Sequence, residues 1–242
     1  MIIFNREEYA AAIAAWDTSS KDYSTIKKLI PPNYVFTLSF DQIDWLKKNN
    51  KCDDFCSEIG VYKNQLVLIL CPLDVNGQKI AVNEYPYSIL AELTSNLTLV
   101  ETKEYTLVKN AVLSKELQQV DKTADMYLPV ANMPIMEQDK AVAAIELWRD
   151  EGSTWFYREC DEFKGARIFK RFYVPVEDLC PSKEGLSYII CSFGIKFSEI
   201  YQRPLVTLIF ISFYKDLQNT GSVEVISNTY DWSRPCPPIC QL

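Results

Sequence analysis

Residues 11–16, Ala-Ala-Ile-Ala-Ala-Trp, return further along the chain as Ala-Ala-Ile-Glu-Leu-Trp at residues 143–148. Four more pairs of segments match in the same order. The spacing between partners grows along the chain, as loop insertions in a second copy would make it. The pairs are 36–46 with 169–179, 56–57 with 191–192, 62–69 with 201–208, and 79–88 with 224–233. The sequence therefore predicts two diverged copies of one structural unit.

Each copy is predicted to begin with a helix and to continue as strands. Tyr9, Ile13 and Trp16 fall on one face of a helix over residues 6–17, and residues 138–151 repeat that pattern. About four strand-like runs follow each helix. They lie near 34–40, 58–63, 65–72 and 78–84, and near 166–174, 186–195, 204–214 and 222–229. Short connections favour antiparallel pairing. The predicted class is α+β, with two helix-plus-antiparallel-sheet units that are related by a pseudo-two-fold axis or lie side by side.

The predicted boundaries place the first unit at 1–88, a partly structured connector at 89–134 and the second unit at 135–242. Within the connector, 97–101 and 104–109 resemble strands and 111–120 resembles a helix. Prolines at the end of the connector favour an extended chain, because each disfavours helix in the residue before it.

Composition predicts a soluble, cytoplasmic protein. Of the 242 residues, 48% are hydrophobic and 24% are charged, which is typical of a packed globular chain. The formal charge of −7 argues against a nucleic-acid partner. The longest apolar run, 204–214, is too short for a helix that spans a bilayer, which needs about 20 residues. The first residues lack the features of a signal peptide. Lys164, Arg167, Lys170 and Arg171 form one basic segment, which is interpreted as the solvated face of a strand.

The chain contains no histidine. That absence removes Ser-His-Asp and Cys-His catalytic arrangements and histidine-ligated metal sites from the possible mechanisms. It also removes the most common general base at neutral pH. No cofactor-binding motif is present either. A non-catalytic role is therefore favoured, although carboxylate-based catalysis stays possible.

One repeated motif is a candidate ligand- or partner-binding site. It has the form Asn-x-Tyr-x-aromatic-Ser and ends in Ser88 in one copy and Ser233 in the other. Alternation along an extended chain places the amide and both aromatic rings on one face, which suits a flat polar ligand, a sugar or a peptide. The alternative is that the aromatic rings cover the end of the core. The candidate residues are Asn83, Tyr85 and Tyr87, with Asn228, Tyr230 and Trp232.

Eight cysteines include two pairs with equal spacing, Cys52 with Cys56 and Cys236 with Cys240. Free thiols are favoured in a cytoplasmic protein of this size. A four-thiolate zinc site and a bridge between Cys236 and Cys240 are the alternatives. The spacing differs from the usual Cys-x-x-Cys, so no metal site is predicted.

The expected function is that of a non-catalytic binding protein, such as an adaptor, inhibitor or immunity-type protein that contacts another protein. Its acidity suits a basic partner. Two alternatives stay open. One is a histidine-free enzyme that acts on a polar substrate such as a glycan through two carboxylates across a cleft. The other is a structural subunit of a larger assembly, for which strand edges are suited.

Overall fold

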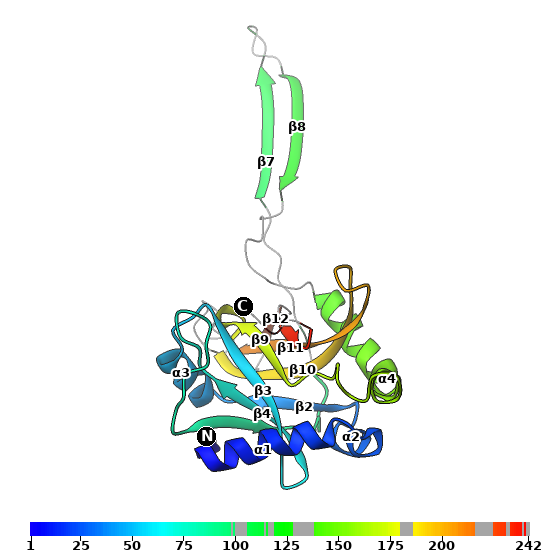
Figure 1. The fold of residues 1–242 in the computed structure, drawn as a ribbon. Helices are drawn as coiled ribbons and strands as arrows, with labels where there is room; N and C mark the ends of the chain where they lie inside the picture. The colour runs from blue at the N-terminus through cyan, green and yellow to red at the C-terminus, as the bar shows by residue number, and fades with distance from the viewer. Residues whose placement is uncertain are drawn as a thin grey trace.

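The computed structural model describes residues 1–97, 99, 106–113, 115, 119–127, 138–179, 186–215, 225–230, 233–238 and 240. These residues form a mixed α+β fold with four α-helices, two antiparallel sheets and a separate two-stranded hairpin (Figure 1). The helices are α1 (Arg6–Ser19), α2 (Tyr23–Leu29), α3 (Phe40–Asn49) and α4 (Gln138–Phe163), with a 3₁₀ turn at Val176–Leu179. Among these helices, none combines the length and the hydrophobicity that a bilayer crossing requires.

Local capping explains where the first helices begin. The Asn5 side chain accepts hydrogen bonds from the backbone N–H groups of Glu7 and Glu8, and the Glu8 carboxylate accepts one from the Asn5 N–H at 3.0 Å. This reciprocal capping box satisfies N–H groups that have no partner within the helix. Ser39 and Gln42 cap α3 in the same way.

The first sheet has the strand order β1-β5-β4-β3-β9-β13. Its strands are β1 (Ile3–Phe4), β3 (Asp54–Tyr62), β4 (Gln65–Cys71), β5 (Tyr85–Ile89), β9 (Arg171–Pro175) and β13 (Arg234–Cys236). The second sheet has the order β12-β11-β10-β2-β6. It contains β2 (Tyr34–Leu38), β6 (Ala91–Glu92), β10 (Leu186–Ser198), β11 (Arg203–Lys215) and β12 (Val225–Tyr230). Each sheet therefore combines strands from both halves of the chain.

The main core takes side chains from both sheets and from α1 and α4. Trp16 and Trp148 are both buried in it, as the sequence predicts. Helices α1 and α4 each pack closely on one sheet, because a glycine of the sheet lies under an alanine of the helix. A Cβ added at Gly60 in β3 would lie 3.0 Å from Ala12 Cβ, and one at Gly194 in β10 would lie 3.4 Å from Ala144 Cβ. A larger residue at either position would separate helix from strand.

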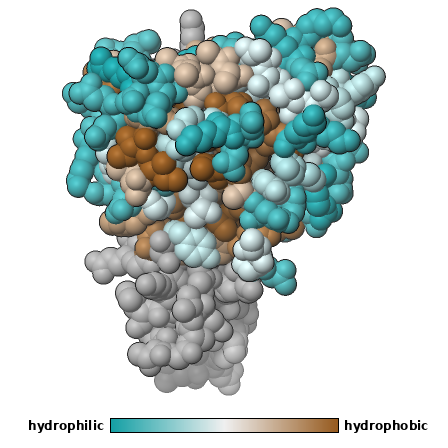
Figure 2. Space-filling view, turned by 90° about the horizontal axis from the view of Figure 1, so that it is seen from below, coloured by the Kyte–Doolittle hydropathy of each residue, from teal (hydrophilic) through white to brown (hydrophobic). Residues whose placement is uncertain are grey.

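The surface has an apolar region on the side where α1 lies. Seen from below, hydrophobic atoms gather in the middle of this face and hydrophilic atoms surround them (Figure 2). The N-terminus lies beside α1 in Figure 1, and its first three residues, Met1, Ile2 and Ile3, are exposed.

The connector departs from its prediction. Its described part contributes β6 to the second sheet and forms β7 (Thr106–Leu113) and β8 (Gln119–Tyr127), an antiparallel hairpin that stands apart from the two sheets (Figure 1). The helix predicted over 111–120 is therefore wrong. Cross-strand pairing from Thr106↔Tyr127 onward satisfies the backbone groups that a helix would have bonded internally. Of the strand predicted over 97–101, residues 98, 100 and 101 lie outside the described part.

Three other predicted boundaries move. The strand expected over 78–84 begins only at Tyr85, because Asp74–Gln78 makes a turn and Lys79 forms a single bridge to Leu73. The strand expected from 166 begins at Arg171. Lys164 and Gly165 have positive φ values there and end α4 in a turn. The helix expected over 138–151 continues to Phe163.

Candidate functional site

The structure places the first copy of the predicted binding motif mostly in the core. Tyr87 stacks on Phe4 with ring centroids 3.7 Å apart, and Tyr85 stacks on Tyr9 of α1 at 4.0 Å. Both β5 rings are buried, so these faces are not available to a ligand in this conformation. Asn83 lies before the strand and is exposed at a shallow hollow that Arg6 also lines.

The second copy of the motif is described only in part. Asn228 and Tyr230 lie in β12, but their side chains, like the whole of Trp232, lie outside the described residues. Binding by these residues therefore stays a prediction. The serine that ends each motif is buried, and its hydroxyl group forms a hydrogen bond with the backbone of a neighbouring strand. Ser88 donates to the Thr37 carbonyl at 2.7 Å, and the Ser233 hydroxyl accepts from the Leu208 N–H at 2.6 Å.

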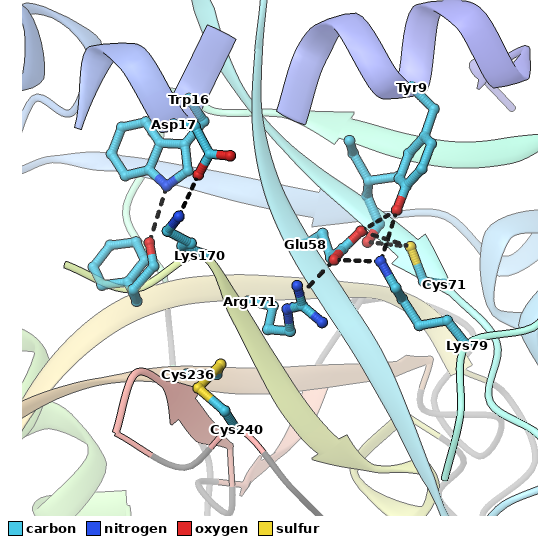
Figure 3. Close-up of polar contacts among 12 residues, drawn as sticks. Tyr9, Trp16, Asp17, Glu58, Cys71, Lys79, Lys170, Arg171, Cys236 and Cys240 are labelled. Carbon is cyan, nitrogen blue, oxygen red and sulfur yellow. Dashed lines mark hydrogen bonds and ion pairs between the residues drawn. A yellow bond between two sulfur atoms is a disulfide. The ribbon is translucent and has the colours of Figure 1, made fainter. Parts of the chain in front are cut away.

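A buried carboxylate under α1 contacts four polar or charged side chains (Figure 3). Glu58 of β3 has only 2% of its surface exposed. The Tyr9 hydroxyl donates to Glu58 Oε2, and the Cys71 thiol contacts the same oxygen at 3.7 Å. The Lys79 ammonium donates to Oε1 at 2.7 Å and to the Tyr9 oxygen at 3.0 Å.

Arg171 of β9 completes this Glu58 cluster. Its Nε lies 3.4 Å from Glu58 Oε1 and forms an ion pair without hydrogen-bond geometry. Two oxygens of a carboxylate offer about four acceptor positions, and three donors use them here while Arg171 adds a nearby positive charge. The cluster therefore joins α1, β3, β9 and the connection between β4 and β5. In the second sheet, apolar side chains make the contact between α4 and β10.

Burial and charge shift the pKa values of the groups around Glu58. Burial raises the pKa of Tyr9 well above its ordinary value, and the charges of Cys71 and Glu58 raise it further. Burial and then the Glu58 charge raise the pKa of Cys71. For Lys79, burial alone would lower the pKa, but the adjacent carboxylate outweighs it and the pKa is raised. The phenol and thiol are therefore held neutral, and the ammonium is held charged, at neutral pH.

This chemistry is that of an internal anchor. The carboxylate has no exposed side from which a substrate could approach, and its acceptor positions already have donors. Sequence reasoning missed the cluster. Its one local signal is a charged residue inside the strand-like run Phe55–Tyr62, because its partners lie far away in the sequence.

The basic segment is only in part the solvated strand face that the sequence predicts, because Lys164 and Lys170 are exposed but only Arg171 lies in a strand. Lys170 pairs with Asp17 at 2.7 Å, and Arg171 pairs with Glu58. Arg167 donates two hydrogen bonds, of 3.0 and 2.7 Å, to the carboxylate of the buried Glu159. These cations stabilise contacts between elements instead of forming an open basic surface.

The two cysteine pairs differ from each other. Cys236 and Cys240 form a disulfide, so the prediction of free thiols is wrong for this pair. Cys52 and Cys56 are free, and Cys56 is buried in β3. The bridged pair has no thiolates to offer a zinc ion in this state. In the described part of the chain, no group of three or more cysteine or acidic side chains is placed to hold a metal ion.

A second missed feature is the loop at the end of the longest hairpin. β10 and β11 pair along their full lengths to Ser198↔Arg203, and residues 199–202 join them. Phe197, Ile200 and Tyr201 are 57%, 87% and 39% exposed there. We call these three residues the hairpin tip, which lies in the orange loop of Figure 1. Its sequence signal is apolar residues inside a turn between two apolar strands.

Comparison with known proteins adds no relative to this description: no protein-family model, curated protein or solved structure matches the chain.

Proposed function

We propose that this chain is a non-catalytic binding protein that contacts a protein partner through the hairpin tip. The observation that carries the proposal is the exposure of three large apolar side chains at one end of the β10–β11 hairpin, two in the loop and Phe197 in the adjoining strand. Large apolar and aromatic side chains contribute most of the binding energy when a partner covers them. The paired strands below the loop limit the conformational freedom that would be lost on binding.

Charge and chemistry support the same proposal. The formal charge of −7 favours a basic partner, since complementary charge speeds association and disfavours wrong partners. The buried Glu58 carboxylate is engaged on both oxygens by side chains of its own chain. An adaptor, inhibitor or immunity-type role is compatible with these properties.

We also infer that the scaffold is a duplicated unit, with copies at 1–88 and 135–242 and a connector at 89–134. The strand orders support this inference. In the first sheet, β5-β4-β3 continue into β9 and β13, and in the second, β12-β11-β10 continue into β2 and β6. In chain order β2, β3, β4 and β5 correspond to β9, β10, β11 and β12, and the first strand of each set, β2 or β9, lies in the sheet of the other half. A pseudo-two-fold relation would produce this arrangement.

A matched pair of variants tests the binding proposal. Phe197→Ser/Ile200→Ser removes the two most exposed tip residues. Phe40→Ser/Val75→Ser removes a similar apolar area elsewhere, because those side chains are 58% and 76% exposed. After cross-linking in native lysate, a partner should be recovered with the wild type and the control, and lost with the tip variant. Equal recovery by both variants would refute the proposal. Turnover of a defined polar substrate by the tip variant would favour an enzyme.

A cytoplasmic location is part of the proposal, and the disulfide makes it testable. Disulfides persist mainly in oxidising compartments. Fractionation of cells in which free thiols are blocked at lysis should find the chain in the cytoplasmic fraction, although Cys236 and Cys240 are bridged in the structure. Recovery of a bridged form from an oxidising compartment would overturn the cytoplasmic assignment and leave the binding proposal unaffected.

A further inference from the structure

A cavity of about 240 Å³ lies between α2, with the segment after it, and the middle of α4. Both helices lie on the same side of the molecule in Figure 1. Three buried side chains, Ile30, Trp148 and Phe156, supply its apolar walls. Gly152 also lines the cavity and lets the backbone of α4 lie close to the Trp148 ring, because any Cβ there would lie 3.0 Å from that ring. The cavity therefore offers aromatic faces to an occupant.

The polar groups of the cavity are mainly donors. The Tyr23 hydroxyl and the Ser153 hydroxyl share one hydrogen bond of 2.8 Å, so one hydroxyl proton is left for another acceptor. Within the part of the chain that the structure describes, the Trp148 indole N–H makes no hydrogen bond. The indole of Trp16 differs, because it donates to the Phe169 carbonyl at 2.9 Å.

The charged side chains of the cavity have one sign. Lys27 and Arg149 line it, and no carboxylate does, although acids outnumber bases in the chain by 32 to 25. Arg149 also pairs with Asp150 at 2.9 Å, but both side chains are more than half exposed. Exposed pairs of this kind exchange readily with water and other anions. Both cations are therefore accessible to an anion at the rim.

We propose that this cavity binds a small organic anion that consists of a flat apolar ring and one carboxylate-like group. The volume of the cavity indicates the class of ligand. A dry cavity of roughly 150 Å³ holds benzene. The cavity of about 240 Å³ is larger than that by about the volume that a carboxylate group requires. The ring would lie against Trp148 and Phe156. The anionic group would face Lys27, Arg149 and the free hydroxyl proton. The site is independent of the hairpin tip.

Benzoate is the probe, and benzamide is its uncharged counterpart of similar shape. Binding is measured by titration at low salt, with the indole N–H signal of Trp148 followed by two-dimensional NMR on the full chain. We expect benzoate to shift this signal and to bind at least about fivefold more tightly than benzamide, since charge is its only advantage. No shift of the Trp148 signal at millimolar benzoate overturns the proposal.

Charge-reversed variants locate the anionic end. Lys27→Glu/Arg149→Glu should raise the benzoate Kd about tenfold and leave benzamide binding unchanged. Lys28→Glu/Arg158→Glu is the matched control, because it changes net charge equally at exposed positions of the same two helices that do not line the cavity. An equal loss of affinity in both variants would show a general charge effect and overturn the site.

A third variant tests the cavity itself. Ser153→Phe places a ring at an exposed position of the lining and should abolish binding of both probes. The circular dichroism spectrum shows whether this variant folds. A folded variant that still binds benzoate with wild-type affinity would contradict the proposal, and the charge-reversed pair decides the question if the variant does not fold.

Discussion

Replacement of the buried Glu58 by glutamine should destabilise the fold more than the same kind of isosteric change at an acid that forms an ion pair on the surface. The substitution keeps the size of the side chain and removes its charge. Lys79 and Arg171 then lose their counter-charge. The new amide N–H₂ group is itself a donor, and it faces donor groups whose hydrogen bonds the carboxylate oxygen had accepted. The Tyr9 hydroxyl keeps an acceptor only if the amide oxygen turns toward it.

The magnitude follows from burial. Removal of one partner from a fully buried ion pair costs about 3–5 kcal/mol because the other charge is left without compensation. Here the side chains of Lys79 and Arg171 are 35% and 32% exposed, so both cations can turn partly toward water. We therefore expect a loss of about 2–3 kcal/mol. For a chain of this length, each kcal/mol lowers Tm by about 2–4 °C, which gives a decrease of roughly 5–10 °C.

The assay is denaturant unfolding of five proteins: wild type, Glu58→Gln, Tyr9→Phe, the double variant of these two, and a control. Tyr9→Phe removes one hydrogen bond to the carboxylate and should cost about 1–2 kcal/mol. Because the two groups touch, the double variant should lose less than the two single losses together. The control, Glu84→Gln, lies at an exposed position and should change stability by less than about 0.5 kcal/mol. A Glu58→Gln loss as small as the control, or strict additivity with Tyr9→Phe, would refute the cluster as an anchor.

Three further predictions concern the rest of the fold. Stability should decrease as pH rises above about 9–10, because the pKa values of Cys71 and Tyr9 are raised in the folded chain above ordinary values of 9.0 and 10.0. The contribution of these two neutral groups to stability is fully present at lower pH. Tyr9→Phe should make the decrease at alkaline pH smaller, and a pH–stability profile that this variant leaves unchanged would contradict the prediction. Replacement of residues 106–127 by two glycines should change Tm by less than about 3 °C, because Thr106 and Tyr127 are paired at the base of the hairpin; a larger change in a thermal melt would show that the hairpin supports the sheets. Fragments 1–97 and 135–242 should each lack cooperative unfolding alone and regain it when mixed, because β2 pairs with β10 and β9 with β3; a fragment that folds alone contradicts this.

Helix α1 was predictable because its signals are local. Asn5 and Glu8 cap α1, and Trp16 lies on its apolar face, all within one short segment. The partner of β2 was not predictable. Its sequence fits any antiparallel neighbour, and only the packing of the whole core selects β10 over β3. Residues 111–120 have the spacing and composition of a helix, but pairing between β7 and β8 overrides that preference. The Glu58 cluster was equally hidden, because Tyr9, Lys79 and Arg171 approach it from three separate segments.

Both candidate binding features lie where the halves of the chain differ. The hairpin of β3 and β4 closes with Lys63 and Asn64 alone, whereas the loop between β10 and β11 has four residues and carries Ile200 and Tyr201. The cavity depends on α2, which follows α1 and has no counterpart between α4 and β9. The Trp16 indole N–H donates a hydrogen bond to the Phe169 carbonyl, whereas Trp148 lines the cavity. If the halves are copies, additions to the shared scaffold created both sites, and the shared elements maintain the core. Removal of the tip or filling of the cavity should therefore alter binding and leave the stability of the fold nearly unchanged.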